Sequence, residues 1–326
     1  MSRFQLLDKI PIVYCKEYNV TFCGLQCLHP YDAERGQHIL ELLLSAEICD
    51  EKHIARPLEI TDQQLLEIHT EDYLNSLKIS DQVGKIAEIP LLHFVPNIFV
   101  QDAYLKPMRF QVGGSLLAAK LALRYGWAIN LGGGFHHCSS DQSGSFSPFA
   151  DISLVVQYLL DESKKVSSVL IVDLAARQGN GFERDLMDKK NVYIFDMFNS
   201  TIYPGDEFAK VAITRRVELP SRTSDEVYLR KLRINLAAVL KEFRPDAIVY
   251  NAGTDVLDGD SLGELSISPE GIIQRDEYVF SKAYAYKIPI VMLLGTGFTK
   301  NVSEIISTSI LNLKEKGYLP SKLWSK

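Results

Sequence analysis

The sequence predicts an α/β fold, in which a doubly wound, mostly parallel sheet carries helices on both faces. Short apolar segments without polar alternation are typical of strands that are buried on both faces. Amphipathic helical patterns lie between these segments, and this alternation is typical of βαβ units with right-handed crossovers. No repeat or long linker interrupts the pattern, so we expect a single domain over residues 1–326 with its core at about 10–318.

Six apolar segments are expected to form strands. In chain order they are Pro11–Tyr14, Trp127–Leu131, Val169–Val172, Val192–Phe195, Ala247–Tyr250 and Ile288–Leu294. Seven segments with apolar residues at helical spacing are expected to form helices. They are Ala33–Ser45, Asp62–Leu77, Gln111–Arg124, Asp151–Leu160, Asp225–Glu242, Pro269–Ala285 and Ser303–Leu313.

The composition is that of an ordinary globular protein, with 46% hydrophobic and 23% charged residues. The 35 basic and 41 acidic residues give a net charge of −6, so the chain lacks the basic footprint of a nucleic-acid-binding protein. Any link to chromatin is therefore expected to run through protein contacts. The N-terminus has no secretory signal pattern, and no apolar run reaches the roughly 18 residues of a membrane span. We expect the protein in the nucleus, the cytoplasm or both.

The chain has five cysteines and no CxxC pair. An odd number of cysteines in a large domain is typical of free thiols in a reducing compartment. We expect buried free thiols at Cys15, Cys23, Cys27, Cys49 and Cys138.

Four polar or glycine-rich segments directly follow expected strands. They are Gly132–Ser140, Asp173–Gly181, Asn251–Gly259 and Gly295–Lys300. Ligands of open α/β sheets bind at the carboxyl ends of the strands. We therefore expect these four loops to converge on one pocket.

Two adjacent histidines, His136 and His137, follow a triple-glycine turn that permits a close approach of backbone to a ligand. A neutral histidine can act as a general base and a second one as an acid, although a structural role is the alternative for each. Asp173 is a candidate for fixing a histidine tautomer, and its alternative is a helix N-cap.

Two further segments carry candidate site residues. Asp255 follows a buried strand and is a candidate metal ligand or, alternatively, a turn or cap carboxylate. Phe298 follows two glycines after the last expected strand. Its ring can pack against an acyl chain, but it has no hydroxyl to donate to an oxyanion.

These segments together resemble the histone deacetylases, and most closely the compact class IV members. The matching motifs are Pro11–Tyr14, Leu28–Asp32, His69–Leu74, Gly132–Ser140, Gln178–Gly181, Ile202–Asp206, Asn251–Asp255, Ser266–Pro269 and Arg275–Glu277. The resemblance implies the arginase/deacetylase fold, a zinc-hydrolase ancestry and acyl-lysine substrates, including long-chain acyl groups.

The resemblance also implies roles for individual positions. His136 and His137 match the tandem catalytic histidines, Asp173 and Asn180 match the residues that support them, and Asp255 matches one zinc ligand. The other two ligands, an aspartate and a histidine, fall at Ala175 and Arg177. The substrate tunnel is expected at Gly134, Phe146, Tyr203 and Phe298, and Phe298 stands where the family has a tyrosine. Ser145 and Phe182 replace a glycine and a histidine of the family pattern.

The substitutions predict an impaired metal site. A methyl group cannot bind a metal, and a guanidinium has no lone pair to donate. Tetrahedral catalytic zinc needs three protein ligands, so zinc is expected to be lost or weakly held. The family's potassium site also loses a carboxylate at Ala175, so the sequence does not decide whether potassium binds. We hypothesise that Arg177 takes the vacated metal position and pairs with Asp255; in the alternative, it extends to solvent through the old tunnel.

Three functions remain open at this point. The first is a catalytically inactive deacetylase-fold protein that binds acyl-lysine peptides or protein partners, for example in transcription complexes. The second is an active zinc-dependent lysine deacylase, with zinc held by His136, His137 and Asp255. The third is a metal-free amide or ester hydrolase that uses the two histidines as acid and base.

Overall fold

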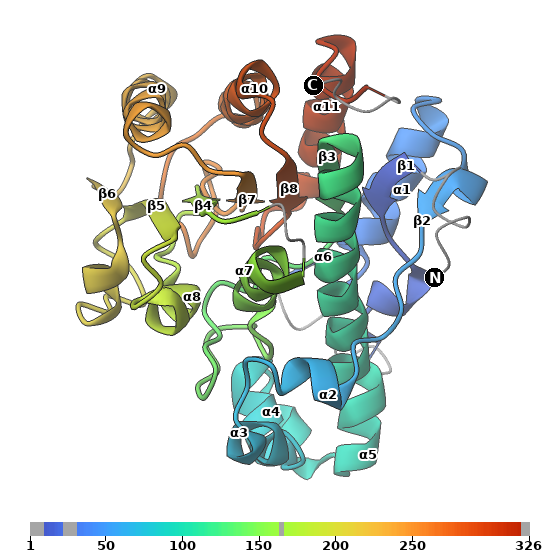
Figure 1. Cartoon of the computed structure of the whole chain (residues 1–326). Coiled ribbons are helices and arrows are strands. Elements are labelled where there is room, and N and C mark those ends of the chain that lie inside the picture. The colour runs from blue at the N-terminus through green and yellow to red at the C-terminus, as the bar shows by residue number, and fades with distance from the viewer. Residues whose placement is uncertain (1–9, 22–30, 163–165, 321–326) are drawn as a thin grey trace.

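The computed structural model describes residues 10–21, 31–162 and 166–320 of the chain (Figure 1). Two of the expected free thiols, Cys23 and Cys27, and the Leu28–Pro30 part of one motif lie outside these residues. The other three cysteines are buried and free, as predicted.

A single eight-stranded sheet organises the molecule, in the order β2-β1-β3-β8-β7-β4-β5-β6. The strands are β1 (Ile10–Val13), β2 (Ile54–Ala55), β3 (Trp127–Asn130), β4 (Val169–Asp173), β5 (Val192–Asn199), β6 (Arg215–Leu219), β7 (Ala247–Asn251) and β8 (Ile290–Leu293). Every neighbouring pair is parallel, which confirms the predicted α/β fold class. The six predicted strands all form, and the two that were not predicted, β2 and β6, are the edge strands.

Helices cover both faces of the sheet (Figure 1). The α-helices are α1 (Arg35–Ser45), α2 (Asp62–Leu65), α3 (Glu71–Ser76), α4 (Ser80–Ile86), α5 (Asn97–Val100), α6 (Lys106–Tyr125), α7 (Asp151–Glu162), α8 (Asn180–Leu186), α9 (Asp225–Glu242), α10 (Pro269–Tyr286) and α11 (Val302–Glu315). None of the helices in the described part of the chain is long and apolar enough to cross a membrane.

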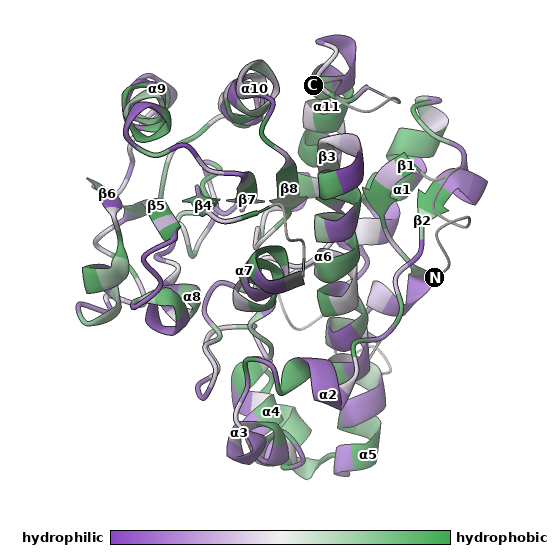
Figure 2. Ribbon diagram, viewed as in Figure 1, coloured by the Kyte–Doolittle hydropathy of each residue, from purple (hydrophilic) through white to green (hydrophobic). Residues whose placement is uncertain are grey.

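The alternation of side chains along each strand divides the core in two. In β4, Val169 and Ile171 face the core that α6 and α7 close, whereas Leu170 and Val172 face the core that α1, α9, α10 and α11 close. Figure 2 shows the strands β1 and β8 as hydrophobic, as expected for strands with apolar neighbours on both faces.

The prediction of one helix over Asp62–Leu77 is wrong, because two short helices, α2 and α3, form there. The backbone of Thr70 is extended (φ −72°, ψ 150°), and its side chain accepts a hydrogen bond from the Tyr73 amide as the N-cap of α3. His69 lies in the break, where its Nε2 accepts a hydrogen bond from the Ala150 amide 3.0 Å away. Tertiary contacts therefore interrupt a pattern that is periodic in sequence.

Candidate functional site

The four predicted loops lie together at the carboxyl edge of the sheet, because β3, β8, β7 and β4 are consecutive neighbours in it. Backbone hydrogen bonds join each loop to the next. The amide of Gly295 donates to Gly133 (3.0 Å), that of Thr254 to Thr296 (2.7 Å) and that of Leu174 to Asn251 (3.1 Å). The predicted convergence of the loops is thus confirmed.

The triple-glycine turn after β3 depends on a buried carboxylate that sequence reasoning missed. The Asp151 side chain accepts hydrogen bonds from the amides of Gly134 (2.9 Å) and Phe135 (2.8 Å). Gly134 has a φ of +84°, and a Cβ there would lie 2.5 Å from Oδ1 of Asn251. Only glycine fits at this position, and the turn directs the following two histidines into the site.

His136 and His137 lie with their ring centroids 4.1 Å apart and are almost fully buried. Nδ1 of His136 lies 2.9 Å from Oδ2 of Asp173, and Nδ1 of His137 lies 2.9 Å from Oδ1 of Asn180. Both oxygens accept hydrogen bonds, so each Nδ1 carries a proton, and in the neutral form of such a ring the lone pair lies on Nε2. Neither Nε2 has a hydrogen-bond partner among the described residues.

Asp173 is the last residue of β4, so the alternative role as a helix N-cap is wrong. Besides His136, its carboxylate accepts hydrogen bonds from the Ala175 amide (3.0 Å) and from Nδ2 of Asn251 (3.1 Å). Burial, followed by the nearby His136 and Arg177, lowers the pKa of His137 well below its ordinary value. His137 is therefore neutral at physiological pH.

Arg177 turns inward, and only 3% of its side chain is exposed. Its Nε lies 3.6 Å from Oδ2 of Asp255, which confirms the hypothesised ion pair and contradicts the alternative of an arginine that extends to solvent. Nη1 donates to Oγ of Ser145 (2.9 Å), and Nη2 donates to Oγ1 of Thr296 (3.2 Å). The guanidinium carbon also lies 5.4 Å from the ring centroid of Phe298.

The carboxylate of Asp255 has further partners. Oδ1 accepts a hydrogen bond from the Ala176 amide (2.8 Å), and Oδ2 accepts one from Oγ1 of Thr296 (3.2 Å). Ala175, which precedes this amide, is fully buried and contributes only a methyl group. Within the described residues, no three His, Cys, Asp or Glu side chains lie close enough together to hold a metal ion.

Two buried carboxyl groups that sequence reasoning missed lie behind Asp173. Asp196 pairs with it in register across β4 and β5, and Oδ2 of Asp196 accepts from the Gly179 amide (2.9 Å). Burial, followed by the charges of Asp173 and Glu183, raises the pKa of Asp196 well above its ordinary value. Burial raises the pKa of Glu183 to about 7. The sequence signal for Asp196 is a carboxylate inside an otherwise apolar strand, whereas Glu183 lies in the short helix α8 and has no such signal.

A cavity of about 390 Å³ opens beside Arg177. The residues that line it are Gln82, Lys85, Ile86, Glu88, Ser143, Gly144, Ser145, Arg177, Tyr203 and Leu262. Of the predicted tunnel residues, only Tyr203 is in this lining, and its ring stands edge-on to His137 at 5.2 Å. Gly134, Phe146 and Phe298 are not in the lining; Phe298 is partly buried, and Phe146 is buried and packs against Tyr31 at a centroid distance of 4.6 Å.

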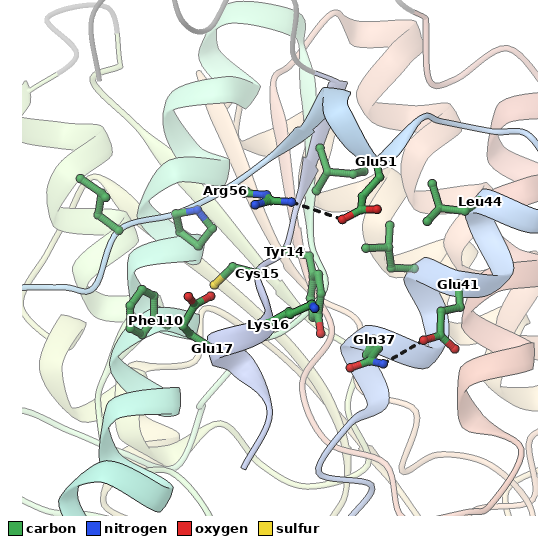
Figure 3. Close-up of a pocket in the computed structure, with 14 residues that line it drawn as sticks. Tyr14, Cys15, Lys16, Glu17, Gln37, Glu41, Leu44, Glu51, Arg56 and Phe110 are labelled. Atoms are coloured by element: carbon green, nitrogen blue, oxygen red, sulfur yellow. Dashed lines mark hydrogen bonds and ion pairs between the residues drawn. The ribbon is translucent and has the colours of Figure 1, made fainter. Parts of the chain in front are cut away.

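A second cavity, of about 670 Å³, lies near β1 and α1, and none of the candidate site residues lines it (Figure 3). Arg56 pairs there with Glu51 at 3.3 Å, and Gln37 donates to Glu41 at 2.8 Å. Burial raises the pKa of the Cys15 thiol well above its ordinary value, which favours the protonated thiol over the nucleophilic thiolate.

Known families, sequences and solved structures include several that are similar to this chain. A family model described as the histone deacetylase domain matches residues 29–313. Histone deacetylase 2 of Arabidopsis thaliana is 46% identical over 316 residues, which cover 97% of this chain and 81% of that protein. The acetoin utilization protein AcuC of Staphylococcus aureus (strain MRSA252) is 27% identical over 314 residues, covering 90% and 80%. A crystal structure of the HDA15 HD domain has the same fold, with a TM-score of 0.73 at 20% identity, and covers 95% of this chain and 89% of that one.

Proposed function

The chain belongs to the histone deacetylase family, and within it we propose a class IV-like, catalytically impaired member that binds acyl-lysine peptides or protein partners. One observation carries the proposal. The buried guanidinium of Arg177 lies against Asp255, the one position of the family's zinc-ligand set that still has a ligand side chain.

The residues present do not fit the family's tetrahedral zinc ion. Asp255 is a single ligand, and both of its oxygens already accept hydrogen bonds. Ala175 supplies no donor atom, and Arg177 brings a permanent positive charge into the position that the cation would need. The family's potassium site loses the same carboxylate at Ala175.

The remaining parts of the site support binding rather than hydrolysis. Phe298 presents a ring where the family has a hydroxyl, and losing such an oxyanion donor typically costs about 10²–10³ in rate. The histidines keep their support from Asp173 and Asn180, but they are buried and do not line the cavity. The hydrogen bonds that orient the two histidines are therefore retained, whereas the zinc ion that acts as the electrophile in the family's reaction has no complete set of ligands.

Metal analysis together with peptide binding tests the proposal. Purified protein is expected to hold far less than one zinc per chain after incubation with zinc and dialysis. It is also expected to bind acyl-lysine peptides more tightly than matched unmodified peptides, without releasing the acyl group. Stoichiometric zinc would overturn the proposal, and equal binding of modified and unmodified peptides would overturn its acyl-lysine part.

The second candidate is an active zinc-dependent lysine deacylase. The unpartnered Nε2 atoms of His136 and His137 favour it, because two imidazole lone pairs are available inside the site. The same experiment separates the two functions, since this candidate requires bound zinc and release of the acyl group.

We further propose that the protein works in the nucleus, the cytoplasm or both, with transcription complexes among its partners. The net charge of −6 favours protein partners over DNA. Imaging of a tagged protein tests the location. Affinity purification of the wild type and of a variant with a substitution at Arg177 tests whether partners bind at the cavity beside this residue.

A further inference from the structure

Arg177 is the one buried, positively charged residue among those that line the 390 Å³ cavity. We infer that this cavity takes a carboxylate on Arg177, and specifically a lysine side chain acylated with a dicarboxylic acid, such as succinyl-lysine. This inference rests on the proposed function, because it needs the arginine rather than a metal ion at the end of the cavity.

The guanidinium is held in place but not saturated. It has five N–H groups, of which the structure uses one on Nη1 for Ser145 and one on Nη2 for Thr296. Nε faces Asp255 at 3.6 Å without a hydrogen bond. One N–H therefore remains on each terminal nitrogen, and N–H groups on the two terminal nitrogens of a guanidinium can bind a carboxylate bidentately.

Asp255 does not remove this capacity. Its two oxygens are already bonded to the Ala176 amide and the Thr296 hydroxyl. The ion pair with Asp255 balances the charge of Arg177 through Nε, and it uses neither of the remaining N–H groups on Nη1 and Nη2. A neutral acyl chain would bury those donors without partners, which is costly, whereas a terminal carboxylate would bond to them.

The rest of the cavity suits a chain of methylenes that ends in an acid. Ile86 and Leu262 provide apolar wall, and the half-exposed ring of Tyr203 stands at the opening. Glu88 is the one acidic residue in the lining; it is exposed, and its Oε1 accepts a hydrogen bond from Oγ of Ser145 (2.6 Å). Lys85 adds a second cation at the exposed rim, where it pairs with Asp81 at 2.7 Å.

The test compares peptides of one sequence that carry succinyl-lysine, acetyl-lysine or unmodified lysine, by isothermal titration calorimetry. We expect the succinyl peptide to bind at least about tenfold more tightly than the acetyl peptide, as charged hydrogen bonds imply. Arg177→Gln should remove this difference. Arg56→Gln is the matched control, since Arg56 is also an ion-paired arginine that lines a cavity, but away from the site (Figure 3).

A double variant, Arg177→Gln with Asp255→Asn, keeps the test decisive if the single variant fails to fold, because it leaves no unpaired buried charge. Preference for the succinyl peptide that survives in the folded variant would overturn the inference. If free succinate binds as tightly as the succinyl peptide, the ligand is a small dicarboxylate and not a modified lysine.

The outcomes also separate this inference from the proposed function. Equal binding of succinyl and acetyl peptides, both above the unmodified one, overturns the inference and leaves the proposed function standing. Binding of all three peptides with equal affinity overturns both the inference and the acyl-lysine part of the proposed function.

Discussion

Nε of Arg177 lies 3.6 Å from Oδ2 of Asp255, and these side chains are 3% and 0% exposed. A buried ion pair contributes little net stability, but removing one partner leaves an uncompensated charge in a medium of low dielectric constant. In the proposed function, the same pair holds a cation at a position that the family resemblance assigns to a metal ligand. Stability and function of this site are therefore linked through one contact.

Replacing Arg177 with alanine is expected to lower the free energy of unfolding by about 3–5 kcal/mol, because Asp255 stays buried without its partner. Adding Asp255→Asn should restore most of the loss. Urea denaturation measures both changes. Arg56→Ala, which breaks an exposed ion pair, is the control and should cost less than about 1 kcal/mol. A single variant as stable as the wild type would contradict the idea that the pair compensates a buried charge.

The combination of Ala175→Asp, Arg177→His and Phe298→Tyr is expected to restore one zinc per chain and lysine deacylase activity. Together with Asp255, the two new side chains would give three zinc ligands and leave one coordination position open, and the tyrosine would add a hydroxyl as oxyanion donor. Elemental analysis and hydrolysis of acyl-lysine peptides measure the result. The variant without Phe298→Tyr should bind zinc but react about 10²–10³ more slowly. A triple variant that stays free of zinc would mean that the site differs from the family in more than these positions.

Gly134→Ala is expected to destabilise the fold more than Gly205→Ala. Both glycines have positive φ angles, and each substitution should cost about 1–2 kcal/mol for that reason. At Gly134 the new Cβ also meets Oδ1 of Asn251 at 2.5 Å, whereas nothing lies within 4 Å at Gly205. Overpacking should add about 1–3 kcal/mol at Gly134. Equal losses in urea denaturation would show that the turn relaxes to make room.

Glu183 should make the fold less stable as the pH rises. Burial raises its pKa to about 7, so the folded protein holds this proton more tightly than the unfolded chain does. Its contribution to stability is complete below the unfolded pKa and is lost between about pH 4.3 and 7, at up to about 1.4 kcal/mol per pH unit. Unfolding free energies measured across this range should fall less steeply for Glu183→Gln than for the wild type. The exposed Glu304→Gln is the control, and a slope unchanged in Glu183→Gln would refute the assignment.

Much of the fold follows from local patterns. The buried strands are short apolar runs, and helix α9 (Asp225–Glu242) has the bounds that its periodicity predicts. The edge strand β6 was missed because its alternating burial, with charged Arg216 and Glu218 on the exposed side, lacks the apolar run of a buried strand. Short helices such as α8 (Asn180–Leu186) span too few turns for a period to be visible.

The sequence by itself determined the family and the candidate residues, because residue types and their order along the chain carry that information. It also showed that Ala175 and Arg177 cannot supply metal ligands, which follows from their chemistry alone. Only the tertiary structure decided where the guanidinium of Arg177 goes. A long side chain can reach solvent or a buried carboxylate equally well from the same backbone position. Asp255, Ser145 and Thr296, which come from three different loops, together draw it inward.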